Sequence, residues 1–196
     1  PTQCRSYAKY NLSGTRADGD DHFQENGKHI SDMFNQSSFT TTTVVDQRNA
    51  VKVDKNLDLR KLGPLGCGYV TGSGTVLNTL KPKPGDTIAV FGTGAVGLAA
   101  MMAGRISGCI KVIAVDIVPE RLELAKELGA THTINSKEED AVAKIKELTN
   151  GYGVDWTVDT TGLPAVIKNG VDALAQGGTC AVSYTHLRAH ETELHL

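Results

Sequence analysis

Short apolar runs alternate with helical patterns along the chain from residue 87 onward. Each run has the length and character of a strand in a buried parallel sheet, and a helical pattern fills every gap between two runs. Parallel neighbours need helical crossovers, and right-handed crossovers place helices on both faces of the sheet. The alternation therefore predicts an α/β fold with a doubly wound parallel sheet. The predicted strands are 87–91, 111–116, 131–135, 154–159 and 179–183.

Four helices are predicted between these strands, and residues that favour helix ends mark their bounds. Proline begins two of them, and glycine follows three of them, as is typical of helix starts and ends. The remaining start is predicted from a capping box, in which a serine precedes a glutamate by three positions. The predicted helices are Ala95–Ser107, Pro119–Leu128, one entered through Ser136-Lys137-Glu138-Glu139, and Pro164–Gln176.

The chain before residue 87 has a different character. Residues 1–36 are polar and turn-rich, which predicts loops. β-Branched residues gather in 38–46 and 49–54, so we expect short paired strands there. The segment 57–80 is apolar but carries five glycines, at positions 63, 66, 68, 72 and 74. Each glycine costs a helix up to about 1 kcal/mol relative to alanine. Because glycine has no side chain and lets backbones approach closely, glycine at that density predicts close backbone contacts.

Composition excludes several classes of protein. With 196 residues, 40% hydrophobic residues and a net charge of −2, the chain is a globular protein with no basic character for nucleic acid. Glycines interrupt its longest uncharged stretch, 87–104, and we expect no membrane span and no secretion signal. The cysteines, at positions 4, 67, 109 and 180, are too few and too scattered for a disulfide framework. A reducing cytoplasm is therefore the expected location.

A glycine-rich turn lies between the first predicted strand and the first predicted helix. The sequence Gly92-Thr93-Gly94-Ala95-Val96-Gly97 has the spacing G-x-G-x-x-G. Gly92 would permit the tight turn, Gly94 would let the backbone approach a pyrophosphate, and Gly97 would allow close packing of helix on strand. The free N–H groups at the start of the helix favour an anionic ligand. We therefore expect a dinucleotide to bind at this turn.

Asp116 ends the next predicted strand, 19 positions after Gly97. An acidic residue there accepts hydrogen bonds from the ribose hydroxyls of adenosine, and Ile117 offers nothing to a 2′-phosphate, which favours NAD over NADP. Two alternatives stay open. The glycines could form a merely structural turn, or the site could bind S-adenosylmethionine in a methyltransferase, although that class usually carries an acid where this chain has Val90-Phe91.

Several segments occur in an order that resembles the zinc-dependent medium-chain alcohol dehydrogenases. They are Leu65-Gly66-Cys67-Gly68-Tyr69-Val70-Thr71-Gly72, Lys83-Pro84-Gly85-Asp86, the strand and turn 89–97, and Leu128-Gly129-Ala130-Thr131. The sequences of Gln36-Ser37-Ser38-Phe39 and of residues 62–68 most resemble those of the aryl-alcohol (benzyl alcohol) branch. The resemblance implies a Rossmann domain preceded by part of a β-rich GroES-like catalytic domain.

The resemblance also implies domain bounds. Residues 1–66 would be the end of the catalytic domain and 67–183 an NAD-binding Rossmann domain. The tail 184–196 resembles translated sequencing-adaptor DNA and is set aside as non-native. Two of its three histidines, His190 and His195, lie five positions apart and so cannot share a helix face as zinc ligands do in H-E-x-x-H.

Site residues follow from the same resemblance. Cys67 would be a ligand of the catalytic zinc, Thr71 would pack on the nicotinamide, and Cys4 would be one cysteine of a structural-zinc lobe. The cofactor cleft would be lined by Val96, Arg121, Thr160 and Thr161. From the residues alone, a lone cysteine is usually buried filler and Arg121 is a solvated charge.

The implied function is hydride transfer between NAD and a primary, aromatic alcohol or its aldehyde, with zinc as the Lewis acid. In the family the other zinc ligands lie upstream of residue 1, so the chain is expected to be an internal fragment that is inactive alone. Its parent would form homo-oligomers and act on small molecules. The alternatives are a nucleotide-binding remnant without catalysis and a zinc-free reductase of the same superfamily.

Overall fold

The computed structural model describes residues 5–16, 19, 23–31 and 40–183. The chain divides into two compact units, and the boundary between them lies between Leu57 and Asp58. The predicted boundary between residues 66 and 67 rests on the family resemblance and stays a prediction. The predicted tail 184–196 lies outside the described residues.

The first unit contains little regular structure in its described part. A two-stranded antiparallel hairpin joins β1 (Gln24–Glu25) to β2 (Lys28–His29). Both residues of its turn, Asn26 and Gly27, have positive φ, as the tight turns of hairpins require. The other elements are α1 (Tyr7–Asn11) and the 3₁₀ turn η1 (Gln47–Asn49).

The prediction of paired strands in 38–46 and 49–54 is wrong for the described residues 40–54. There the backbone makes bends and the η1 turn, without a strand. Val44 and Val51 are 65% and 84% exposed, so no core selects a strand conformation for these β-branched residues. High β-propensity alone does not form a strand, because the propensity reflects packing on a sheet surface.

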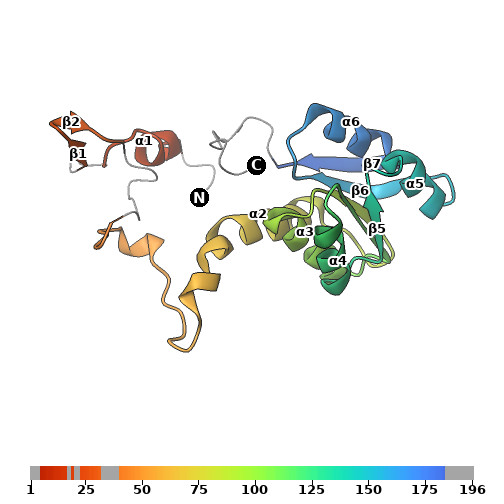
Figure 1. Ribbon diagram of the computed structural model, residues 1–196, viewed down its shortest axis with the longest axis horizontal. Helices are drawn as coiled ribbons and strands as arrows, with labels where there is room; N and C mark the ends of the chain where they lie inside the picture. The colour runs from red at the N-terminus through yellow and green to blue at the C-terminus, as the bar shows by residue number, and fades with distance from the viewer. Residues whose placement is uncertain (1–4, 17–18, 20–22, 32–39, 184–196) are drawn as a thin grey trace. The chain divides into compact units, whose positions relative to one another are not determined.

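The second unit contains the predicted alternation of strands and helices, which is confirmed (Figure 1). It begins with the 3₁₀ turns η2 (Leu59–Lys61) and η3 (Gly63–Gly66), the helix α2 (Gly68–Gly74) and the π-helical segment η4 (Thr75–Leu80). The elements that follow are β3 (Thr87–Phe91), α3 (Ala95–Ile106), β4 (Lys111–Asp116), α4 (Pro119–Glu127), β5 (His132–Asn135), α5 (Ala141–Leu148), β6 (Val154–Asp159), α6 (Pro164–Asp172) and β7 (Leu174–Val182).

The five strands β3 to β7 form one parallel sheet in the order β5-β4-β3-β6-β7. The chain starts at the centre with β3, moves outward through β4 to β5, and then returns to the other side of β3 with β6 and β7. The direction of winding therefore reverses between β3 and β6. In open α/β sheets ligands bind at this reversal, beside the carboxyl ends of the strands.

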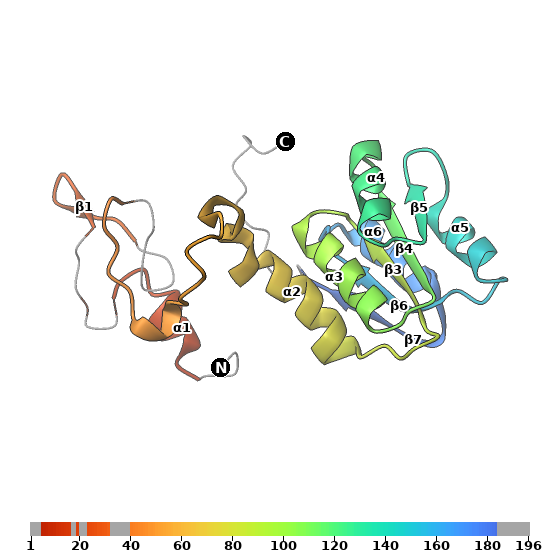
Figure 2. The ribbon, with the colours of Figure 1, turned by 90° about the horizontal axis from the view of Figure 1, so that it is seen from below.

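Helices cover both faces of the sheet (Figure 2), and alternate residues of the strands bury against opposite faces. Ile88 and Val90 pack with α3, α4 and η4. Their neighbours Ala89 and Phe91 point to the other face and pack with α5 and α6. Because both faces of the central strand are covered, the doubly wound architecture predicted from the sequence is confirmed.

The predicted capping box at Ser136 is wrong. Residues 136–139 form a turn, in which Glu138 and Glu139 donate their N–H groups to the carbonyl of Asn135. The α5 helix begins at Ala141, where the carboxylate of Asp140 accepts hydrogen bonds from the N–H groups of Val142 and Ala143. An aspartate placed directly before the helix satisfies the same free N–H groups and shortens the helix by one turn.

The predicted helix 164–176 ends earlier than expected, at Asp172. Leu174 pairs with Val154 and already belongs to β7, and the regular pairing resumes at Thr179 opposite Trp156. The intervening residues bulge out, with Gly177 at φ +83°. Helical spacing of apolar residues predicted the helix, but strand pairing across the sheet determined its end.

Candidate cofactor-binding site

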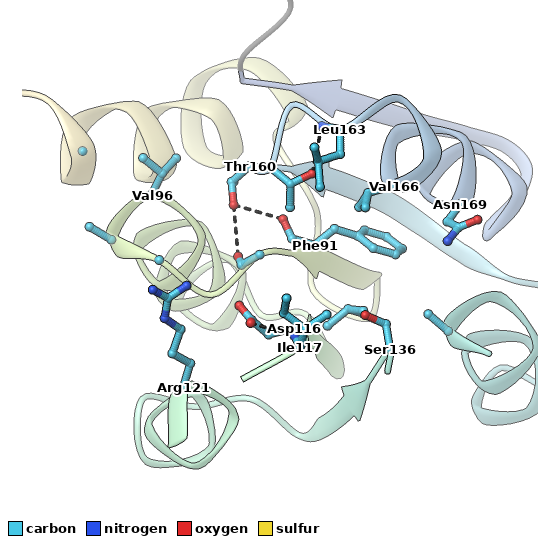
Figure 3. A pocket seen from close by; sticks show the side chains of 17 residues that line it. Phe91, Val96, Asp116, Ile117, Arg121, Ser136, Thr160, Leu163, Val166 and Asn169 are labelled. Carbon is cyan, nitrogen blue, oxygen red and sulfur yellow. Dashed lines mark hydrogen bonds between the residues drawn. The ribbon is translucent and has the colours of Figure 1, made fainter. Parts of the chain in front are cut away.

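A pocket of about 530 Å³ lies at the carboxyl ends of β3, β4 and β6, where the winding of the sheet reverses (Figure 3). Among the described residues that line it, only Asp116 and Arg121 are charged, and most of the others are apolar or glycine. Its wall consists of Gly68, Phe91, Gly92, Gly94, Ala95, Val96, Val115, Asp116, Ile117, Arg121, Ser136, Ala141, Thr160, Thr161, Leu163, Val166 and Asn169.

The glycine-rich turn forms one side of this pocket. Gly92 has φ +89°, and a Cβ there would lie 2.6 Å from the Thr160 hydroxyl. A Cβ on Gly97 would lie only 1.9 Å from the Gly92 carbonyl oxygen, so that α3 packs on the turn only with glycine at this position. Gly94 is different, because a Cβ added to it would meet no protein atom within 4 Å and would stand in open space.

Asp116 ends β4 and is only 7% exposed. Its Oδ2 accepts hydrogen bonds from the Thr93 N–H and hydroxyl, both at 2.7 Å. Its Oδ1 accepts from the N–H groups of Ile117 at 2.7 Å and Val118 at 3.0 Å. Burial raises the pKa of the carboxyl, but the hydrogen bonds from Thr93, Ile117 and Val118 outweigh it, and the net pKa lies below its usual value. Asp116 is therefore a carboxylate fixed at the pocket wall.

The segment after β6 is tied to the glycine-rich turn. The Thr160 hydroxyl lies 3.0 Å from the Phe91 carbonyl oxygen and 3.1 Å from that of Gly92, contacts drawn in Figure 3. Buried Asp159 accepts from the Thr161 hydroxyl at 2.7 Å and from the Gly162 N–H at 2.9 Å. The Thr160 contacts hold the ends of β3 and β6 together, and the Asp159 contacts fix the segment that follows β6. Thr160 and Thr161 both line the pocket.

Arg121 and Val96 also line the pocket. The Arg121 side chain extends from α4 toward the glycine-rich turn in Figure 3. Arg121 is exposed, so solvent screens its charge, yet the side chain borders the pocket. Val96 lies on the first turn of α3, whose N–H groups have no acceptor within the helix.

Several lining residues were not predicted. Ser136 directly follows β5. It could have been predicted, because ligands of parallel sheets bind beyond the carboxyl ends of the strands. Val166 and Asn169 lie on α6, which packs over the same face as Phe91. Nothing in the local pattern of α6 distinguishes these two from its other residues, because only the tertiary packing brings them to the pocket.

Cys67 and Thr71 do not belong to the pocket wall, although Gly68 beside Cys67 does. Cys67 is an exposed free thiol that directly precedes α2, and the Thr71 N–H donates to its carbonyl at 2.8 Å. Within the described part of the chain there is no group of three or more His, Cys, Asp or Glu side chains able to hold a metal ion. Cys4 lies outside the described residues.

The pocket fits a dinucleotide at its adenosine and pyrophosphate end. Gly94 leaves space for a group against the backbone, the start of α3 supplies free N–H groups, and the Asp116 carboxylate stands at the second strand as a ribose acceptor would. The described residues do not fit a zinc ion in the same way, since a zinc site takes three or four protein ligands and Cys67 is one thiol.

Comparison with known proteins identifies the family of this chain. Residues 95–188 match the family model of the zinc-binding dehydrogenases. The chain is 42% identical to geraniol dehydrogenase of Castellaniella defragrans, with 91% of this chain and 48% of that protein aligned. The crystal structure of benzyl alcohol dehydrogenase from Acinetobacter calcoaceticus superimposes with a TM-score of 0.82 at 43% identity, over 95% of this chain and 51% of that one. The chain belongs to the zinc-dependent medium-chain alcohol dehydrogenase family.

Members of this alcohol dehydrogenase family use NAD and zinc. A probable alcohol dehydrogenase of a Pseudomonas species is 37% identical over 93% of this chain and 58% of its own length. The chain thus spans about half the length of the curated relatives it matches.

Proposed function

We propose that this chain supplies the dinucleotide-binding domain of an alcohol dehydrogenase that oxidises a primary, aromatic alcohol with NAD. The observation that carries the proposal is the pocket at the winding reversal, where the glycine-rich turn faces the Asp116 carboxylate. The name of the benzyl alcohol dehydrogenase with a similar structure favours an aromatic substrate. When bound, the nicotinamide exchanges a hydride with the alcohol carbon.

The chain's own residues bind and orient the cofactor. The backbone at Gly94 and the first turn of α3 would hold the pyrophosphate, because free N–H groups and the helix dipole favour negative charge. Asp116 would accept hydrogen bonds from the ribose hydroxyls. Arg121 would add positive charge at the open side of the pocket, and Phe91 would face the base from the apolar side.

Asp116 also supports the choice of NAD over NADP. A 2′-phosphate would place negative charge against a carboxylate whose own pKa is held low, so both groups would be charged at neutral pH. Ile117, the next residue along the wall, has no group that would compensate a phosphate.

Cys67 is proposed as one thiolate ligand of a catalytic zinc, with Thr71 beside the nicotinamide. Thiolate suits zinc, and the exposed thiol before α2 is accessible to a metal. Because the described residues form no group of three ligands, Cys67 would contribute one ligand to a zinc site that needs others.

The cellular compartment and the oligomeric state of the parent protein are also proposals. The described cysteines Cys67, Cys109 and Cys180 are free thiols, which suits a reducing cytoplasm. A homo-oligomeric parent protein is proposed from the family resemblance. None of the helices in the described part of the chain is long and apolar enough to cross a membrane.

Cofactor binding tests the proposal directly. NADH and NADPH are titrated by fluorescence against the 196-residue chain, the Asp116→Ala variant and the Asp172→Ala variant, which removes an exposed carboxylate from α6. We expect the unsubstituted chain and Asp172→Ala to prefer NADH by roughly tenfold or more, since repulsion and lost hydrogen bonds both penalise NADPH. Asp116→Ala should lose this preference. Equal affinity for both cofactors in the unsubstituted chain would refute the assignment.

A further inference from the structure

Thr93 contacts the carboxylate of Asp116 from behind the pocket. Its N–H and its hydroxyl both lie 2.7 Å from Oδ2, and the residue is 1% exposed. Its neighbours Gly92 and Gly94 line the pocket, whereas Thr93 does not. The hydroxyl therefore contacts the carboxylate without occupying the space in which a ligand would bind.

The Thr93 hydroxyl has a property that the other donors to Asp116 lack. Ile117, Val118 and Thr93 itself each donate a main-chain N–H, which any residue except proline would supply. The hydroxyl is thus the one contact of the four that depends on a side chain, and among the small residues that fit a tight turn only threonine and serine provide it.

The orientation of an aspartate carboxylate is soft, because its terminal torsion has a broad energy profile. Two donors on Oδ1 and two on Oδ2 fix the plane of the Asp116 carboxylate relative to the pocket. Removing the hydroxyl would leave Oδ2 with a single donor and would let the plane turn. A fixed plane matters because hydrogen bonds to a diol depend on the direction of the acceptor.

We propose that Thr93 is a positioning residue that orients the Asp116 carboxylate toward the ribose diol of the bound cofactor, and so sets the affinity for its adenosine end. The inference rests on the proposed function and goes beyond it, because it assigns a side-chain role to Thr93, the residue between the first two glycines of the turn.

The test separates this role from a general effect on the turn. Binding of ADP and of 2′,3′-dideoxy-ADP, which lacks the ribose diol, is measured by calorimetry for the 196-residue chain and for Thr93→Val, Thr93→Ala and Thr93→Ser. We expect Thr93→Val and Thr93→Ala to bind ADP roughly tenfold more weakly, because a misoriented Asp116 carboxylate would lose a hydrogen bond from the ribose, and a hydrogen bond to a charged group typically contributes this much affinity. Both should bind dideoxy-ADP within about twofold of the unsubstituted chain, and Thr93→Ser should retain the ADP affinity.

The second arm of the test uses Asp116→Ala. In that background Thr93→Val should leave the ADP affinity unchanged, because the residue it positions is absent. Equal weakening toward ADP and dideoxy-ADP would show that Thr93 only shapes the turn, and tighter ADP binding would show that its hydroxyl competes with the ribose. Either result overturns the inference while leaving the proposed function intact. Failure of the unsubstituted chain to bind ADP would overturn both.

Discussion

Asp116 is a nearly buried charge, and its surroundings decide whether that charge stabilises or destabilises the fold. Leaving water penalises the carboxylate, but hydrogen bonds to an ionised group are about twice as strong as neutral ones. Here four donors offset the loss of water. The same carboxylate that would bind the ribose therefore joins the turn after β3 to the end of β4.

The first prediction concerns the pH dependence of stability at this residue. Because hydrogen bonding lowers the pKa of Asp116 in the folded chain, the carboxylate stabilises the fold at pH values above the unfolded pKa, about 3.9. The stabilisation is lost as pH falls through the lower folded pKa. The difference in unfolding free energy between the unsubstituted chain and Asp116→Asn should thus be largest near neutral pH and should shrink below about pH 4.

Urea unfolding at several pH values measures this difference. Asp172→Asn is the control, because its ion pair with Lys168 is exposed and contributes at most about 1 kcal/mol. If the difference for Asp116→Asn stayed constant down to pH 3, the hydrogen bonds would not be holding the ionised form.

At the scale of the element, α2 packs against α3 through a glycine. A Cβ on Gly72 would lie 2.0 Å from the carbonyl oxygen of Val96 and 2.9 Å from the Ala99 side chain. The backbone of α2 therefore approaches the first turns of α3 more closely than any other residue would allow. Since Gly68 of α2 and Val96 of α3 both line the pocket, this contact also shapes the pocket wall.

Gly72→Ala should destabilise the fold by about 1–3 kcal/mol, because backbone atoms cannot yield as a flexible side chain would. The matched control is Gly74→Ala in the same helix, where the nearest atom is the Asn78 side-chain nitrogen at 3.7 Å. Alanine has the higher helix propensity, so the control should change stability little or raise it by up to about 1 kcal/mol. Thermal unfolding of the two variants measures the contrast, and equal stabilities would contradict the close packing of α2 on α3.

At the scale of the whole molecule, cofactor binding and catalysis place different demands on the chain. The pocket for the adenosine end is built from residues 68–169 alone. A catalytic zinc of this family needs three protein ligands and an open position, and the described residues offer no group of three. We therefore expect binding without turnover from the 196-residue chain.

The corresponding experiment incubates the chain with benzyl alcohol, NAD and zinc, follows NADH absorbance, and measures bound zinc by mass spectrometry. Neither sustained NADH formation nor one tightly held zinc per chain is expected, and Cys67→Ser should behave like the unsubstituted chain. Turnover accompanied by stoichiometric zinc would contradict this expectation and would require further ligands.

The sequence by itself determined the alternation of strands and helices from β3 to β7 and the glycine-rich turn after β3. Strand positions such as 87–91 and 111–116 agree with the structure because the interiors of buried parallel strands need continuous apolar runs, which are a local property. The glycines of the turn were likewise predictable, since positive φ and close backbone approach admit few other residues.

Only the tertiary structure decided the rest. Leu174, which lies inside the predicted helix 164–176, belongs to β7 because it pairs with Val154 of β6, so strand pairing decides where the helix ends. The β-branched residues 40–54 formed no strand without a sheet to pack on. Asn169 reaches the pocket, and Thr93 reaches Asp116 from 23 positions away, only when the sheet brings them together. Such contacts depend on long-range packing, which no local pattern encodes.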